Sequence, residues 1–80
     1  MKLMPVRAYG LERGKLTVPE MKIGDYTVVK RIVDVLPTER KAVGDEVGAL
    51  NGWTLHKKGD VYYLRRGELV VYLEPFHPPW

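Results

Sequence analysis

Residues 53–74 read WTLHKKGDVYYLRRGELVVYLE, three β-rich runs separated by two turns of the same composition. Each turn has two cations, a glycine and an acid: Lys57-Lys58-Gly59-Asp60 and Arg65-Arg66-Gly67-Glu68. Glycine supplies the positive φ that a two-residue hairpin loop requires. With Lys58-Gly59 and Arg66-Gly67 as the loops, the sequence predicts three antiparallel strands in this register: Lys57 opposite Asp60, Leu55 opposite Tyr62, Leu64 opposite Leu69, and Tyr62 opposite Val71.

Side chains alternate between the two faces of a strand, so this register sorts the residues of the three strands into two sets. One set is apolar and is predicted to form the core face: Trp53, Leu55, Tyr62, Leu64, Leu69, Val71 and Leu73. The other set is amphipathic: Thr54, His56, Val61, Tyr63, Arg65, Val70, Tyr72 and Glu74.

Three further extended segments precede these strands. Lys2 to Tyr9 has extended character, and Lys15 to Val18 is predicted to return beside it as a hairpin across the Gly10–Gly14 turn. After the Gly24-Asp25 turn, residues 26–36 form the longest β-rich run, with apolar residues at both parities. Such a run is typical of a strand covered on two sides or bent within a barrel.

Residues 38–50 are predicted to form a helix. Pro37 stops the preceding strand and Thr38 is a suitable N-cap. Val43, Val47 and Leu50 recur with the period of an α-helix, and Asn51-Gly52 is a suitable C-terminal stop. Gly44 and Gly48 weaken this helix, so it would need tertiary packing.

The expected fold class is therefore β-rich α+β with the order βββ-α-βββ and one helix at about 38–50. The expected architecture is a small antiparallel partly closed barrel or curved sheet of the OB or SH3-like type. Residues 1–74 form the expected single domain. Residues 75–80 form a Pro-rich C-terminal tail ending in Trp80, which could dock on its own domain or on a partner.

The stretch from Leu16 to Ile32, with Gly24-Asp25 before a valine-rich strand, resembles the opening of the SH3-like accessory domain of bacterial ferrous-iron transport. The resemblance covers about a fifth of the chain and lacks the Leu-Gly-Leu and Pro-Gly punctuation expected after the helix. It transfers no functional residue to this chain.

The composition excludes several chemistries. The chain of 80 residues has no cysteine and no serine, so it has no disulfide, thiolate metal site, or cysteine or serine nucleophile. His56 and His77 lie 21 residues apart, outside any metal-binding spacing, and no glycine-rich phosphate loop is present. We therefore expect a protein that is not an enzyme, with no metal and no cofactor.

The composition also suggests a source and a compartment. Glutamine is absent and Asn51 is the only asparagine, which together with abundant charged residues is the thermophile pattern. The N-terminus has no signal-peptide pattern and no apolar run is long enough to span a bilayer. The prediction is a thermostable cytoplasmic protein without a membrane partner.

The leading functional prediction is nucleic-acid binding, to single-stranded or structured RNA or DNA. The net charge is +3 and the cations come in pairs, while tyrosines share the amphipathic face with an arginine and a histidine. The predicted nucleic-acid-binding residues are Lys57, Lys58, Arg65, Arg66, His56, Tyr63 and Tyr72. The alternative is a homo-oligomeric or partner-binding protein–protein interaction module that uses Val61, Val70, Tyr63, Tyr72 and Trp80.

Overall fold

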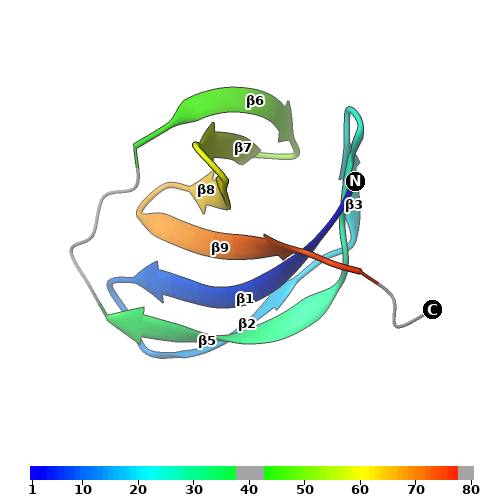
Figure 1. Ribbon diagram of the computed structural model, residues 1–80. Helices are drawn as coiled ribbons and strands as arrows, with labels where there is room; N and C mark the ends of the chain where they lie inside the picture. The colour runs from blue at the N-terminus through cyan, green and yellow to red at the C-terminus, as the bar shows by residue number, and fades with distance from the viewer. Residues whose placement is uncertain (38–42, 78–80) are drawn as a thin grey trace.

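The computed structural model describes residues 1–37 and 43–77, and these residues form nine β-strands in one mixed sheet (Figure 1). The strands are β1 (Lys2–Gly10), β2 (Gly14–Val18), β3 (Met21–Ile23), β4 (Tyr26–Val28), β5 (Arg31–Pro37), β6 (Asp45–Leu50), β7 (Trp53–Lys58), β8 (Val61–Arg66) and β9 (Leu69–Pro75). Their order in the sheet is β2-β5-β1-β9-β8-β7-β6, while β4 also pairs with β1, and β3 with β4.

The predicted meander of β7, β8 and β9 is confirmed, but both of its loops lie one residue further along the chain. The loops are Gly59-Asp60 and Gly67-Glu68, so Lys58 pairs with Val61 and Arg66 pairs with Leu69. Each glycine thus takes the first loop position, where it has a φ of 60° or 58°, as a type II′ turn requires.

Moving each loop by one residue changes the pairing between neighbouring strands by two residues. Because side chains alternate between the faces with a period of two, each face keeps the residues predicted for it. The core face is confirmed: Trp53, Leu55, Tyr62, Leu64, Val71 and Leu73 are buried in the main cluster, and Leu69 packs against it. The other face of the meander is the outer face of the curved sheet.

Strand β1 has three partners. It runs antiparallel to β9, parallel to β5 at Ala8, and parallel to β4 at Lys2. The predicted hairpin between β1 and β2 is wrong, although both strands exist, because β5 lies between them. Strand β5 places Val33 and Val35 in the same layer as the core residues of its neighbours, so this insertion completes the apolar interior.

The long β-rich run of residues 26–36 is divided into two strands. After the predicted Gly24-Asp25 turn, β4 ends at Val28 and β5 begins at Arg31. The break at residues 29–30 lets the first half pair with the start of β1 and the second half with its end. The core residues of the run therefore change parity between the two strands, from Val28 on β4 to Val33 and Val35 on β5. The run is not covered on both sides, because Ile32 and Leu36 of β5 are exposed.

The predicted helix at 38–50 is wrong where the structure describes it, since Asp45–Leu50 is strand β6, and residues 38–42 lie outside the described residues. Asn51 and Gly52 have φ values of 49° and 85° and form a tight turn that leads β6 back along β7. Asn-Gly is a strong signal for such a hairpin, which here outweighs the helical spacing of three apolar residues. The β-rich class holds, without the helix.

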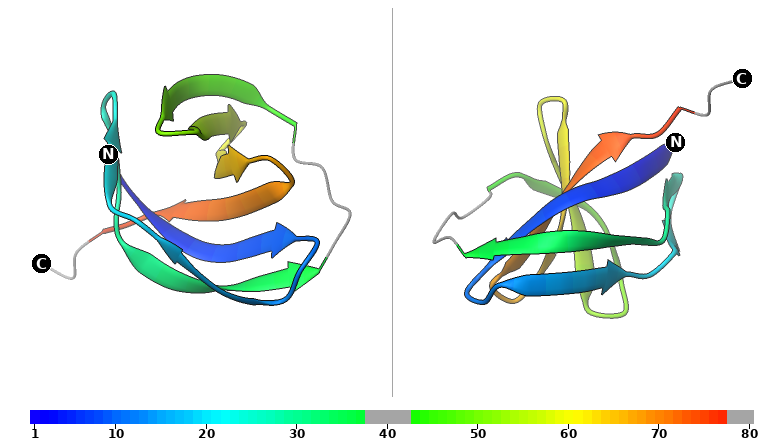
Figure 2. Two further views of the ribbon diagram at one scale, coloured as in Figure 1. Left: turned by 180° about the vertical axis from the view of Figure 1, so that it is seen from behind. Right: turned by 90° about the horizontal axis from the view of Figure 1, so that it is seen from below.

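The sheet curls so that β6 and β3 approach each other across a seam that has no ladder of hydrogen bonds (Figure 2). The sheet is therefore strongly curved and is not closed into a barrel. Gly48 on β6 lies directly against Ile23 on β3, and a β-carbon at residue 48 would overlap the Ile23 side chain. The seam is held by side-chain packing, and it depends on the absence of a side chain at this glycine.

The C-terminal strand extends into the predicted tail. Strand β9 runs to Pro75, and the backbone nitrogen of Phe76 donates a hydrogen bond of 2.9 Å to the carbonyl oxygen of Lys2. The first residues of the predicted tail, 75–76, are thus attached to β1. Trp80 lies outside the described residues.

We predict that Gly48→Ala will lower the free energy of unfolding by about 1–3 kcal/mol, because the added methyl group overpacks the seam. Gly10→Ala is the matched control, since a β-carbon there would meet its nearest neighbours at an ordinary 3.4 and 3.5 Å. Urea denaturation measures both variants. Equal effects of the two substitutions would contradict the packed seam.

Candidate functional site

Four aromatic rings cross the outer face of four adjacent strands. His56 on β7 stacks on Tyr63 of β8 at 4.9 Å between ring centroids and 6° between planes. Tyr63 lies 6.2 Å from Tyr72 on β9, and Tyr72 meets Tyr9 on β1 edge to face at 5.5 Å and 86°. We call these four residues the aromatic row.

Tyr63 is the buried member of the row. Only 2% of its surface is exposed, because His56 and Tyr72 flank its ring and the chain at Gly44 passes beside its hydroxyl group. Burial raises the pKa of Tyr63, since the phenolate would lose hydration. Tyr63 therefore has no ring face for a base to stack on, and its place is to support the rings on either side.

His56 is held by both of its ring nitrogens. Its Nε2 lies 2.7 Å from the hydroxyl oxygen of Thr54, and its Nδ1 makes a long hydrogen bond of 3.4 Å to the carbonyl oxygen of Gly44. These contacts fix the imidazole parallel to Tyr63. The half-buried His56 ring thus forms one end of the row.

The two paired-cation turns place their cations on opposite faces. Lys57 lies over the ring of Tyr62, with Nζ 5.5 Å from its centroid, and Arg66 lies over Trp53 at 4.4 Å. Both belong to the core face, at the ends of their strands. Lys58 and Arg65 belong to the outer face together with the aromatic row. The structure thus separates the four predicted cations into two pairs.

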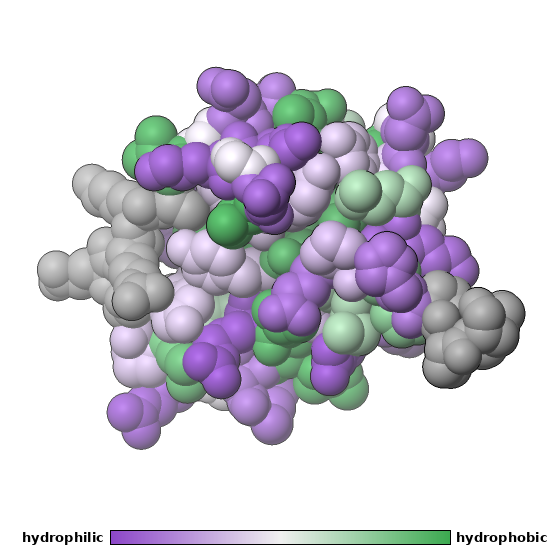
Figure 3. Space-filling view, viewed as in Figure 1, coloured by the Kyte–Doolittle hydropathy of each residue, from purple (hydrophilic) through white to green (hydrophobic). Residues whose placement is uncertain are grey.

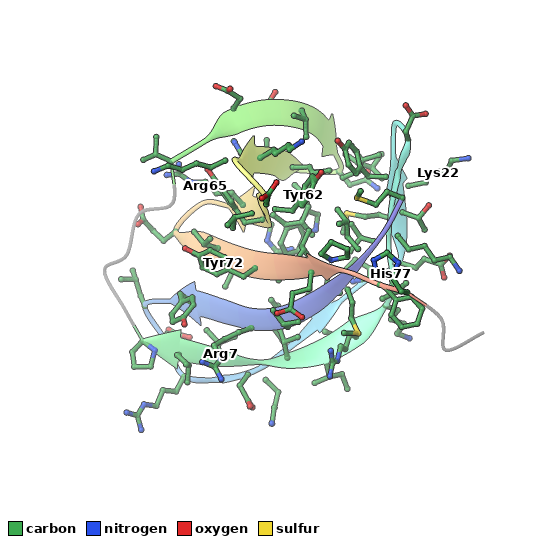
Figure 4. All side chains as sticks on the ribbon, viewed as in Figure 1. Arg7, Lys22, Tyr62, Arg65, Tyr72 and His77 are labelled. Atoms are coloured by element: carbon green, nitrogen blue, oxygen red, sulfur yellow. The ribbon has the colours of Figure 1, made fainter. Side chains whose placement is uncertain are left out.

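Strand β1 brings two further residues to the outer face. Arg7 pairs with Tyr72 in the ladder, and Tyr9 pairs with Val70. Figure 4 shows Arg65, Tyr72 and Arg7 in succession across the outer part of the sheet. Sequence reasoning missed Arg7 and Tyr9 because no local signal says that the first strand lies beside the last. The only available hint was that chain termini often lie close together.

A groove of about 390 Å³ opens at this junction of β1 and β9. It is lined by Val6, Arg7, Tyr9, Tyr72 and Glu74. The ladder passes from Pro5 to Arg7 without pairing Val6, so a β-bulge forms part of the lining of the groove. Bulges are common beside functional sites, where they change the direction of a side chain. Here the bulge shifts the register of β1 against β9 just before Arg7.

The Lys15 ammonium pairs with Asp34 on the neighbouring strands and holds the pKa of that carboxyl below its usual value. Arg7 also lowers this pKa, by a smaller electrostatic effect. Arg7 acts on Asp34 without a direct ion pair, and it forms none with any other acid within residues 1–37 and 43–77.

A second hollow, of about 440 Å³, lies where the β1–β2 loop faces the β8–β9 turn. Its cations are Arg13, Lys15 and Arg66, and its acids are Glu12 and Glu68. Two of these cations already have partners, since Lys15 binds Asp34 and Arg66 covers Trp53. This hollow has no exposed ring and is a weaker candidate than the groove at β1 and β9.

The residues predicted for a protein interface are only partly available. Val61 is 47% exposed and Tyr72 is half-buried, whereas Val70 and Tyr63 are buried, and Trp80 lies outside the described residues. On the side of the molecule in Figure 3, hydrophobic groups form separate spots among polar ones. A large continuous apolar patch, the usual mark of a protein interface, is not seen on that side.

Two further properties concern the described part of the chain alone. It holds no group of three or more His, Asp or Glu side chains that could bind a metal ion. It also holds no helix of the length and apolar character needed to cross a membrane.

Comparisons of the chain with protein-family models, with curated proteins and with solved structures give no match.

We predict that Tyr63→Phe will make the protein less sensitive to alkaline pH. Stability from the neutral buried phenol is complete below the ordinary tyrosine pKa of about 10 and is lost as pH rises through the raised folded-state pKa. Urea denaturation between about pH 9 and pH 11 should show a smaller loss of stability in the variant.

Tyrosine absorbance provides the control for this prediction. Tyr26 also has a raised pKa, because of its hydrogen bond with Tyr62. Tyr26→Phe should remove that late-titrating tyrosine and leave the one at Tyr63. If the tyrosine lost from the absorbance titration in Tyr63→Phe is one that titrates at the ordinary pKa of about 10, the raised pKa of Tyr63 is contradicted.

Proposed function

We propose that this protein binds nucleic acid on the outer face of β7, β8, β9 and β1. The observation that carries the proposal is the aromatic row with arginines beside it: Arg65 on β8 and Arg7 on β1 lie on either side of Tyr72. Proteins that bind single strands combine exposed rings, on which bases stack, with cations that contact the phosphates.

The positions of the side chains support a changed set of residues for this proposed function. Tyr72, Tyr9 and His56 offer rings, and Arg7, Arg65 and Lys58 offer cations. Tyr63 is buried between His56 and Tyr72 and supports their rings. Lys57 and Arg66 lie on the other face, over Tyr62 and Trp53. A binding site that spans four strands at about 4.8 Å per strand has the width needed for a short stretch of single strand.

The proposal requires unpaired bases. In a duplex the faces of the bases are covered by their neighbours, so a ring on a sheet can stack only on a base that is splayed out. Tyr72 and Tyr9 are half-buried within the sheet surface rather than placed on a protruding element. This geometry favours single strands, loops and bulges over continuous duplex.

Assembly through the same face is the alternative function. Its predicted residues Val70 and Tyr63 are already buried within the protomer, which leaves Val61 and the half-buried Tyr72 among the described residues, while Trp80 lies outside them. The remaining area is small for a stable interface, which buries about 800 Å² per partner. The elution mass, recorded with the binding measurement below, distinguishes this alternative.

We predict micromolar binding of a labelled single-stranded oligonucleotide, measured by fluorescence anisotropy. With about three phosphate contacts, affinity should be about 20-fold lower at 200 mM than at 50 mM salt, through counterion release. Tyr72→Leu should weaken binding about fivefold or more, since a base–ring stack is worth roughly 1–3 kcal/mol. Arg7→Ala should also weaken binding and reduce its dependence on salt, because it removes one phosphate contact.

Arg13→Ala is the matched control for charge, because Arg13 is exposed and lies in the β1–β2 loop away from the row. It should change affinity by about twofold at most. Binding lost equally in Arg13→Ala and Arg7→Ala would indicate attraction to net charge alone. Absence of binding, with a dimeric elution mass, would support assembly instead.

A further inference from the structure

The groove at β1 and β9 contains two opposite charges that do not neutralise each other. Arg7 and Glu74 both line it, both are exposed, and neither has an ion pair within residues 1–37 and 43–77. Glu74 pairs with Met4 before the Val6 bulge, and Arg7 pairs with Tyr72 after it. The bulge therefore holds the two charges at different points along the groove.

A negative carboxylate is unexpected in a surface that contacts phosphates, since it repels them. The Glu74 carboxylate can contribute to binding if the ligand also carries hydrogen-bond donors. An ionised carboxylate only accepts hydrogen bonds and can accept two at once. The lining of the groove thus includes the cation Arg7, the rings of Tyr9 and Tyr72, and the two acceptor oxygens of Glu74.

The rings limit the groove to one base. Tyr72 and Tyr9 meet at 86°, so they cannot both lie flat against parallel stacked bases. One ring supplies the stacking face while the other closes the side of the groove. The volume of about 390 Å³ lies at the small end of ligand pockets, which also favours a single base.

The donor pattern then selects among the bases. On its Watson–Crick edge, guanine presents two adjacent donors, N1–H and the 2-amino group, which match the two oxygens of a carboxylate. Adenine and cytosine present one amino group beside an acceptor, and uracil presents one N–H between two carbonyl groups. An acceptor-only carboxylate therefore favours guanine.

We propose that the groove reads one unpaired guanine, with Glu74 accepting from its Watson–Crick edge, Tyr72 or Tyr9 stacking on the base, and Arg7 contacting its phosphate. The proposal rests on the nucleic-acid-binding function of the outer face and adds a base preference to it. The same chemistry could be supplied by a free guanine nucleotide, and the test has separate arms for the two sources.

The test uses labelled seven-nucleotide RNAs of uridine in which the central base is guanine, inosine, adenine or uracil. Inosine retains N1–H but lacks the 2-amino group, so it removes one of the two donors. We expect the guanine oligomer to bind about tenfold more tightly than the uridine oligomer, the discrimination of one good bidentate pair. Inosine should lose most of that advantage.

Glu74→Gln should reduce the preference for guanine over uracil to about twofold or less, without weakening the binding of the all-uridine oligomer. Glu68→Gln is the matched control, because it makes the same change of charge in the exposed β8–β9 turn. It should leave the preference intact. Thermal unfolding of both variants verifies the fold.

The outcomes separate the two proposals. Salt-dependent binding of all four oligomers with equal affinity, or a preference that survives Glu74→Gln, would overturn the guanine groove and leave the nucleic-acid function standing. Titration with guanosine and uridine monophosphates tests the free nucleotide. Selective binding of the guanosine nucleotide alone would support the groove and overturn the oligonucleotide function, and no binding in either arm would overturn both.

Discussion

The structure depends on strand β1, which has β9 along one edge and both β4 and β5 along the other. Leu3 and Ala8 of this strand are fully buried, so β1 joins the two halves of the apolar interior. Without β1 the C-terminal meander would end in an unpaired edge at β9, and β5 and β2 would have no sheet to extend. Because β1 pairs with β9, the contacts that unite the fold are those between the two ends of the chain.

The same pairing creates the candidate site. His56, Tyr63 and Tyr72 belong to the meander, but the row is completed only when β1 adds Tyr9 beside Tyr72. The meander therefore has a packed layer on each face: the apolar core inside and a layer of polar-faced rings outside. Tyr63 is central to the outer layer, since its burial holds the neighbouring rings in position.

Local chemistry was sufficient to predict some parts of this arrangement. The glycine turns and the alternation of residues 53–74 determine the meander and its two faces, because both signals act between residues close in sequence. The helix prediction failed because a spacing of three apolar residues was outweighed by the hairpin at Asn51-Gly52. The groove could not be predicted, since Arg7 and Glu74 come to line it together only through the long-range pairing of β1 with β9.

The paired cations show how alternation gives neighbouring residues different roles. In an extended strand, consecutive side chains point to opposite faces, so a cation pair that ends a strand must send one member to each face. Lys57 and Arg66 lie over the core rings Tyr62 and Trp53, where a cation–π contact contributes roughly 0.5–1 kcal/mol at an exposed site. Their neighbours Lys58 and Arg65 lie on the outer face beside the aromatic row. One repeated turn sequence thus stabilises the ends of the core and supplies positive charge to the proposed binding surface.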